Sequence, residues 1–327
     1  MLINIGEPKK NRYMRTPFSF NNIIGKSAGM QTVYRKIMKT ATSHANVIIY
    51  GESGTGKELV AHAIHNISSR KSKQFVAVNC GGIAESLAES QFFGHSRGAF
   101  TGATENKAGF LDLSHEGTLF LDELGEISLN MQVKLLRVLD GYGYRAVGEN
   151  KLRKPNIRIV AATNKNLKKM VEQGTIREDF YYRVHILPIL LPPLRERKED
   201  IPLLVRYVME KDFHGQEIPY VPPEVLEALM QHEWPGNVRE LQNVIRRYLA
   251  FGKLDIPSPV SATVAPSLTL LPPQSTGESL AEKMAGIERG IILDCLERNQ
   301  WHRSKVAKEL AINIKTLYRK MVAFGLN

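Results

Sequence analysis

A glycine-rich run in the first quarter of the chain has the residue types and spacing to bind phosphate. The run reads Gly51-Glu52-Ser53-Gly54-Thr55-Gly56-Lys57-Glu58. An apolar stretch at residues 47–50 precedes it and a helix-like stretch at residues 59–64 follows it, which predicts a strand, a loop and a helix. In such a loop the backbone N–H groups face a phosphate chain, and Lys57 can reach the β and γ phosphates. A nucleoside triphosphate, in the first place ATP, is the expected ligand; an ordinary glycine-serine turn is the alternative.

The loop departs from the general phosphate-binding pattern at its last position, where Glu58 replaces a serine or threonine hydroxyl. Mg²⁺ must then find its ligands elsewhere. An apolar run at residues 118–121 ends in Asp122 and Glu123, and a P-loop enzyme needs such carboxylates opposite its phosphate loop. We expect Asp122 to hold Mg²⁺ and Glu123 to polarise the water that attacks the γ-phosphate. The alternative is an acidic loop start.

A further strand-like run, at residues 159–162, also ends in polar side chains. Ligands sit at the carboxyl ends of strands in open α/β sheets, so Thr163 and Asn164 could sense the γ-phosphate or orient the attacking water. A helix cap for the segment from Leu167 onward fits the same pattern equally well.

The polar residues at these strand ends can form one site only if a folded domain brings the strands together. The chain of 327 residues is long enough for two or three domains. Apolar runs alternate with helical patterns, at residues 47–50, 75–78, 119–121, 157–162 and 184–190. Because the runs are continuous rather than alternating, they predict a parallel α/β sheet covered on both faces. The expected division is a basic tail or linker (1–19), the α/β ATPase subdomain (20–198), a helical lid (199–252), a flexible linker (253–278) and a small all-α domain (279–327).

The net charge of +11 is concentrated at the two ends of the chain. Residues 1–16 and 302–327 together supply +8 of it, and a basic end folded as a helical module is typical of a protein that binds nucleic acid. Cys80 and Cys295 lie far apart in sequence, and neither a signal peptide nor a membrane-spanning apolar run is visible. We expect a cytoplasmic protein without a membrane partner.

A hexapeptide adds a family resemblance. It reads Gly98-Ala99-Phe100-Thr101-Gly102-Ala103. The two glycines permit a tight excursion that presents Phe100 and Thr101 at a loop tip, where an exposed aromatic side chain suggests contact with a partner. A buried hairpin turn is the alternative. The hexapeptide resembles that of the bacterial enhancer-binding proteins, AAA+ ATPases that remodel sigma-54 RNA polymerase, so this loop is expected to contact sigma-54.

The resemblance implies roles for residues whose spacing alone does not assign them. Asn79 matches the position that restrains the catalytic glutamate until a partner is engaged. Arg177 and Arg183 match arginine fingers that reach the nucleotide of a neighbouring subunit, where a planar guanidinium can neutralise charge on transferring phosphate oxygens. The alternatives are a strand cap for Asn79 and surface charges for the arginines.

Other positions match the same family around the nucleotide. Arg239 matches the sensor arginine of the lid, and Ile24 lies in a segment that resembles the one packing on adenine. Residues 145–148 resemble the second pore-side loop, and Glu58 is what this family carries at that position. The implied fold is an AAA+ P-loop parallel sheet with a helical lid.

The carboxyl-terminal residues predict a helix-turn-helix. Helical stretches at 303–310 and 314–324 are separated by three residues, and Asn313 is a good N-cap for the second helix. The expected DNA-contacting residues are Lys315, Thr316, Arg319 and Lys320. A basic helical hairpin for protein contacts is the alternative. The segment resembles the Fis-type DNA-binding domain, although Ala311 replaces the usual turn glycine and Ile314 a usual polar residue, which puts the base preference in doubt.

Together these features predict a ring-forming AAA+ ATPase, expected to be a hexamer, that binds upstream double-stranded DNA and opens promoters for sigma-54 RNA polymerase holoenzyme. A DNA-binding repressor that keeps the ATPase fold and a generic AAA+ unfoldase are the alternatives. No receiver or ligand-sensing domain fits into residues 1–19, so the expected control is a regulatory protein in trans, expression level or a domain missing from this chain.

Overall fold

The computed structural model describes residues 19–213 and 219–256 and, in the carboxyl-terminal part, 288–289, 292–293, 295–296, 299, 301–310 and 312–326. The chain divides into two compact units, Met1–Pro259 and Val260–Asn327, and each is described by itself. Most of the predicted tail (1–19) and of the predicted linker (253–278) lies outside the described residues, as does Ala311.

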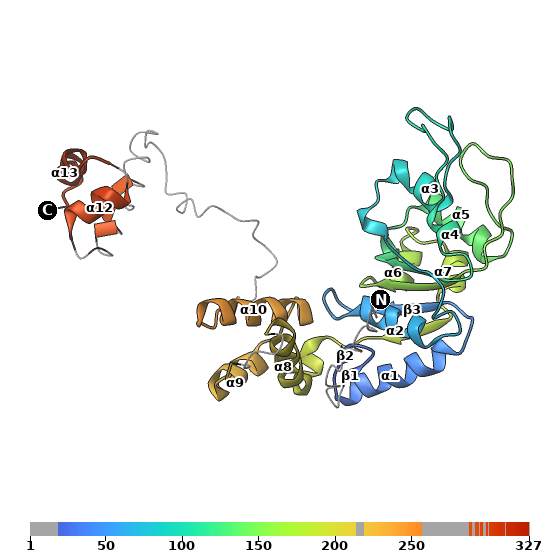
Figure 1. Cartoon of the computed structure of the whole chain (residues 1–327), viewed down its shortest axis with the longest axis horizontal. Helices are drawn as coiled ribbons and strands as arrows, with labels where there is room; N and C mark the ends of the chain where they lie inside the picture. Colours follow the sequence, from blue (N-terminus) through green and yellow to red (C-terminus); the bar gives the residue numbers. More distant parts are fainter. Residues whose placement is uncertain are drawn as a thin grey trace, which may run out of the picture. The chain divides into compact units, whose positions relative to one another are not determined.

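Five parallel strands form the sheet of the first unit (Figure 1). Across the sheet their order is β4-β5-β6-β3-β7. Their bounds are Val47–Tyr50 (β3), Phe75–Asn79 (β4), Thr118–Asp122 (β5), Arg158–Thr163 (β6) and Leu187–Leu190 (β7). The predicted parallel α/β class is therefore confirmed.

One predicted strand began too early. The apolar run at 184–190 starts inside helix α7 (Glu178–Val184), and β7 begins only at Leu187. Val184 is buried because it closes the helix against the core. A short apolar run cannot distinguish the buried end of a helix from a buried strand, which is why periodicity misplaced the boundary.

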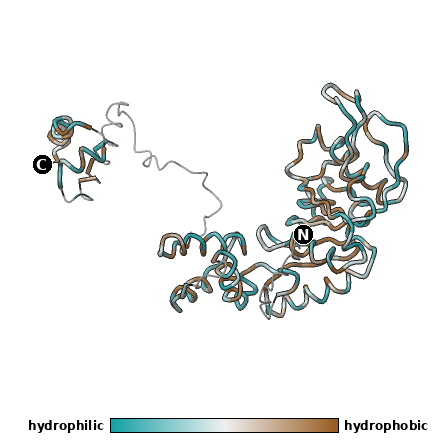
Figure 2. Tube along the Cα trace, in the orientation of Figure 1, coloured by the Kyte–Doolittle hydropathy of each residue, from teal (hydrophilic) through white to brown (hydrophobic). Residues whose placement is uncertain are grey.

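Alternate residues of the three central strands β5, β6 and β3 face two separate cores. In β3, Ile48 packs into one core while Val47 and Ile49 pack into the other. Helices α1 (Ala28–Ala41) and α2 (Lys57–Ile67) cover the second core. The first core is covered by α3 (Glu85–Phe93), α5 (Leu129–Leu139), α6 (Leu167–Glu172) and α7. Figure 2 shows the central strands as mostly hydrophobic, as strands buried on both faces must be.

A helical lid follows the sheet. It contains two short turns, η3 (Leu194–Glu196) and η4 (Lys198–Asp200), and the helices α8 (Ile201–Asp212), α9 (Pro223–Gln231) and α10 (Asn237–Phe251). Its core surrounds the fully buried Trp234, whose indole N–H donates to the Leu229 carbonyl at 2.8 Å. Ile24 of the small strand β2 (Ile23–Ile24) joins this core, so the lid also packs on the start of the domain.

The second unit contains α12 (Arg303–Glu309) and α13 (Ile314–Ala323). Val306 and Ala307 of the first helix and Leu317 and Met321 of the second are buried together in the core of this unit. The Asn313 side chain accepts from the Lys315 backbone N–H at 2.9 Å, which is the predicted N-cap. Within the described part of the chain no helix is long and apolar enough to cross a membrane.

Candidate active site

A cavity of about 500 Å³ lies between the carboxyl ends of the strands and the lid. Its lining includes most residues of the predicted site: Ile24, Ser53, Gly54, Thr55, Gly56, Lys57, Glu58, Asn79, Asp122, Glu123, Asn164 and Arg239. The predicted residues outside the lining are Gly51, Glu52, Thr163, Arg177 and Arg183. The fold thus brings together residues that lie up to two thirds of the chain apart.

The glycine loop runs from β3 into the amino end of α2. Gly54 and Gly56 have φ angles of 77° and 103°, which side chains rarely allow, so the loop needs glycine at both positions. Lys57 Nζ donates to the carbonyls of Gly51 and Glu52 at 2.9 and 3.0 Å. Burial lowers the pKa of Lys57, while the negative charges of Asp122 and Glu123 oppose that shift. The lysine therefore sits at the loop with two carboxylates nearby.

Asp122 and Glu123 stand at the end of β5. Asp122 pairs in register with Asn79 of β4, and its Oδ1 accepts from the Glu123 backbone N–H at 2.9 Å. Glu123 has φ of 54°, a left-handed conformation that costs free energy outside glycine and tends to occur at functional sites. Carboxylate oxygens beside a phosphate loop fit Mg²⁺, which proteins often bind through one or two carboxylates plus nucleotide phosphates.

Asn79 lies in the cavity wall but its amide is turned to its own backbone. Its Oδ1 accepts from the N–H groups of Gly81 and Gly82 at 2.9 and 3.1 Å, which caps the short turn η1 (Cys80–Gly82). This is the geometry of a strand cap. Restraint of Glu123 by Asn79 stays a prediction.

The two polar residues that follow β6 differ in placement. Asn164 lines the cavity, whereas Thr163 is buried and its Oγ1 accepts from the Lys165 backbone N–H at 3.0 Å. Neither caps the next helix, since Asn166 is the N-cap of α6. Asn164 is therefore the better placed of the two to meet a nucleotide.

Apolar side chains form another part of the cavity wall. Ile23 and Ile24 of β2 line it together with Leu204 and Tyr207 of α8. Ile24 shares the lid core with both α8 residues. An apolar wall of this kind suits a nucleobase, and the packing of Ile24 on adenine stays a prediction.

Several residues that contact the glycine loop were not predicted from the sequence. Arg195 of η3 and Asn237 of α10 both donate to the Glu52 carboxylate, at 2.6 to 3.1 Å. The buried Arg197 donates to the Thr55 carbonyl at 3.0 Å. Arg195 and Glu52 are 143 positions apart, so no local pattern connects them. Glu52 therefore faces the lid instead of the cavity.

The two predicted finger arginines lie away from this cavity, on and beside α7. Arg177 pairs with Asp179 at 2.8 Å. Arg183 donates to the Leu139 carbonyl at 2.8 Å and pairs with Asp140 at 3.1 Å. Both side chains are 46% exposed. Neither reaches the nucleotide cavity of its own chain.

The hexapeptide loop connects α3 to the short helix α4 (Phe110–Leu113). Gly98 and Gly102 have φ angles of 79° and 101°, and the Gly98 N–H donates to the Ala103 carbonyl at 2.8 Å. Phe100 is 41% exposed, with its ring 5.0 Å from that of His95. The aromatic side chain at the tip is thus available for contact instead of buried in the core.

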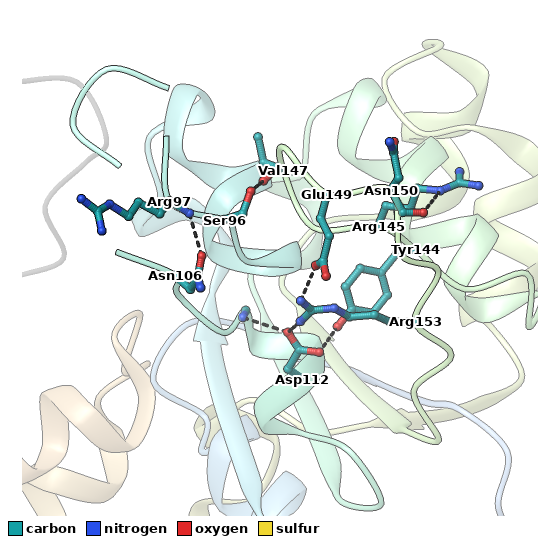
Figure 3. Close-up of polar contacts among 11 residues, drawn as sticks. Ser96, Arg97, Asn106, Asp112, Tyr144, Arg145, Val147, Glu149, Asn150 and Arg153 are labelled. Atoms are coloured by element: carbon teal, nitrogen blue, oxygen red, sulfur yellow. Dashed lines mark hydrogen bonds and ion pairs between the residues drawn. The ribbon is translucent and has the colours of Figure 1, made fainter. Parts of the chain in front are cut away.

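The base of this loop is tied to the segment that contains residues 145–148 (Figure 3). Arg153 lies between Asp112 and Glu149, donates to Asp112 at 2.7 Å and forms an ion pair with Glu149. The Tyr144 hydroxyl donates to the same Asp112 carboxylate, and burial together with that contact raises the pKa of Tyr144. Asp112 therefore joins α4, the helix that follows the hexapeptide loop, to Tyr144 and Arg153, which lie on either side of residues 145–148.

In the second unit, the predicted DNA-contacting residues are not equivalent. Lys315 and Arg319 are exposed, and Thr316 is half-buried. Lys320 forms an ion pair with Glu288 at 2.5 Å. Arg303 of α12 lies over the Tyr318 ring, 5.6 Å from its centroid. The exposed basic face is thus composed of residues from both helices.

Three protein families match successive parts of the chain. The sigma-54 interaction domain matches residues 23–190, the AAA+ ATPase lid domain matches 195–259, and the Fis family of bacterial regulatory proteins matches 283–324. The order of the three agrees with a sheet domain, a lid and a carboxyl-terminal helical unit.

Whole proteins with these parts are similar to the chain. A signal-transduction and transcriptional-control protein of Clostridium beijerinckii is 41% identical over 321 residues, 97% of this chain and 51% of that protein. The DNA-binding transcriptional regulator NtrC of Rhizobium meliloti is 38% identical over 93% of this chain and 70% of its own length. The chain thus spans about half the length of the first of these relatives.

A solved structure is also similar along most of the chain. NtrX from Brucella abortus, in complex with ATP, has a TM-score of 0.68 at 33% identity, over 93% of this chain and 69% of that one. The glycine loop, the carboxylates of β5 and the exposed hexapeptide loop all lie within the residues that match the sigma-54 interaction domain. The chain therefore belongs to the family of sigma-54-dependent transcriptional regulators, with an AAA+ ATPase domain and a Fis-type helix-turn-helix.

Proposed function

We propose that the chain binds ATP with Mg²⁺ in the cavity between sheet and lid and hydrolyses it there. The observation that carries this proposal is the convergence of Lys57, Asp122, Glu123 and Arg239 on one cavity. The similarity to NtrX, whose structure was solved with ATP, supports the same ligand.

Each residue has a chemical task. Lys57 and the N–H groups of the glycine loop bind the phosphates, and Glu123 accepts a hydrogen bond from the attacking water and polarises it. Asp122 is the residue that would hold Mg²⁺, which when bound neutralises charge on the phosphate oxygens. Arg239 lies beside Ser53 of the loop, with 3.4 Å between Nη1 and Oγ, and is placed to contact the phosphates from the lid side.

Hydrolysis needs a ring in this proposal. Arg177 and Arg183 are half-exposed and lie outside the cavity of their own chain, so they would act on the nucleotide of an adjacent copy. An arginine supplied in trans accelerates phosphoryl transfer by stabilising charge in the transition state. A homo-oligomer, expected to be a hexamer, would contain one such site at each interface.

The work done by hydrolysis is promoter opening. The exposed loop with Phe100 and Thr101 would contact sigma-54, and the second unit would bind double-stranded DNA upstream through Lys315 and Arg319. Tethering to DNA raises the local concentration of the ATPase near the promoter. Such a protein would work in the cytoplasm, where the bacterial chromosome lies, and a regulatory protein could control it in trans.

The test is reconstitution of promoter opening. The purified chain is mixed with sigma-54 RNA polymerase holoenzyme, a sigma-54 promoter and ATP, and single-stranded thymines at the start site are detected with permanganate. The proposal expects reactivity that requires hydrolysable ATP. Tight ATP binding and hydrolysis without any promoter opening would contradict the proposed coupling.

A further inference from the structure

The lid helix α10 begins in direct contact with the glycine loop. The backbone N–H groups of Val238 and Arg239 donate to the Gly54 carbonyl at 3.1 and 3.3 Å. Gly54 has φ of 77°, and a β-carbon there would lie 2.3 Å from the Gly236 carbonyl oxygen. The lid therefore rests on the backbone of the phosphate loop, with no room for a side chain between them.

Glu52 holds this contact from the side of the loop. Arg195 donates through its two terminal nitrogens to the two carboxylate oxygens of Glu52 at 2.8 and 2.6 Å, a bidentate pair. Asn237 Nδ2 donates to the same carboxylate at 3.1 Å and to the Ser53 carbonyl at 3.0 Å. The hydrogen bonds from Arg195 lower the pKa of Glu52, which keeps the carboxylate ionised at neutral pH.

Asn237 connects the glycine loop to the turn η3. Its Oδ1 accepts from the Leu194 backbone N–H at 2.8 Å, so the turn η3 and the start of α10 are joined through one side chain. Asn237 is fully buried and has φ of 54°. A backbone in that conformation persists only where its surroundings hold it, and here the surroundings are the glycine loop and η3.

We propose that Glu52 and Arg195 are positioning residues of the nucleotide site, which hold the lid over the bound phosphates and so set how long ATP and ADP stay. Arg239 lies two residues after Asn237 in α10, so the pair also fixes the residue that faces the phosphates from the lid. The inference rests on the proposed ATPase function. It assigns to Glu52 a task other than phosphate binding.

The expected effect follows from the contacts that are lost. Removal of the Arg195 side chain breaks a bidentate pair but leaves Asp122 and Glu123 of the sheet in place. The two partners are 36% and 42% exposed, so solvent weakens the pair. We expect ADP to dissociate about tenfold faster and KM for ATP to rise about as much, with a much smaller change in kcat.

The experiment measures dissociation of a fluorescent ADP analogue by stopped flow from the full chain. Arg195→Ala should release it faster, and Arg195→Lys should be intermediate, because an ammonium group cannot form the bidentate pair. Lys198→Ala is the matched control: Lys198 pairs with Glu233 at 2.9 Å, and both residues belong to the lid. This control should release the analogue at the wild-type rate.

A second measurement reports directly on the contact between the start of α10 and Gly54. Amide hydrogen exchange at residues 238–239 should be faster in Arg195→Ala than in Lys198→Ala, because these amides donate to Gly54. If Arg195→Ala does not fold, Glu52→Gln, which preserves the shape of the side chain, must show the same fast release. Wild-type dissociation in a folded variant that lacks the pair overturns the inference. Failure of the wild-type chain to bind the analogue would instead contradict the proposed ATPase function.

Discussion

The carboxylate of Glu123 lies directly against Gly81. A β-carbon at Gly81 would be 2.4 Å from Glu123 Oε2, closer than side-chain atoms can approach. At the next position, Gly82, a β-carbon would meet nothing nearer than Asn79, at 3.9 Å. With φ of 54° at Glu123 itself, the glutamate is held between a strained backbone and a glycine that follows the neighbouring strand.

Gly81→Ala should therefore displace the Glu123 carboxylate and slow hydrolysis without preventing ATP binding. A shift of about 1 Å at a catalytic group costs up to about 100-fold in rate. The substitution leaves the glycine loop at residues 51–58 unchanged, so the dissociation constant for ATP should stay near that of the wild type. Gly82→Ala is the control and should hydrolyse ATP normally. Equal kcat in the two variants would contradict the assigned place of Glu123.

Glu123→Ala and Lys57→Ala should fail at different steps. Loss of the carboxylate should keep ATP binding and lower kcat by about 100-fold or more, the usual contribution of a general base. Loss of the lysine should weaken binding itself, because in the proposed site its ammonium group would contact the phosphates. Calorimetric titration with ATP, together with phosphate-release kinetics, separates the two effects. Wild-type turnover in Glu123→Ala would remove that residue from the mechanism.

Mixed rings test whether the arginines act between copies. Arg177→Ala or Arg183→Ala combined with Lys57→Ala should recover part of the ATPase activity, since some interfaces then join an intact nucleotide site to an intact arginine. Each variant alone should be nearly inactive. Activity is measured over a range of mixing ratios. The absence of any recovery in rings shown to contain both variants would place the arginines in their own subunit's site.

The ion pair of Lys320 predicts unequal effects on DNA binding. Lys315→Ala and Arg319→Ala should each reduce the slope of log affinity against log salt concentration by about 0.9, the value for one phosphate contact. Lys320→Ala should change the slope less, because Glu288 already neutralises this ammonium group. Fluorescence anisotropy on a footprinted DNA fragment at several salt concentrations measures the slope. A larger change for Lys320→Ala than for the other two would contradict the pairing.

Features with local signals were predictable from the sequence. The glycine loop at 51–58 and the carboxylates after residue 121 are contiguous patterns whose chemistry demands a defined place in a parallel sheet, and all but Gly51 and Glu52 line one cavity. The cap at Asn313 likewise depends only on its neighbours in sequence.

What could not be predicted depends on contacts between distant residues. Nothing near Glu52 indicates that Arg195 and Asn237 bind it, because helices and strands between them decide where the lid sits. The same holds for Lys320, whose partner Glu288 belongs to an earlier segment of the second unit. The predicted start of the strand at 184–190 was wrong for another reason. The buried end of a helix and a buried strand have the same apolar pattern, so the pattern cannot place the boundary between them.

In the proposed function, ATP hydrolysis drives promoter opening through the loop at residues 98–103. The most direct measurement compares ATP turnover and open-complex formation in the same reaction for the wild-type chain and for Phe100→Ala. The exposed ring of Phe100 is proposed to contact sigma-54 and has no chemical task in hydrolysis, so the variant should hydrolyse ATP and leave the sigma-54 promoter closed. Normal promoter opening by Phe100→Ala, at wild-type ATP turnover, would contradict the account.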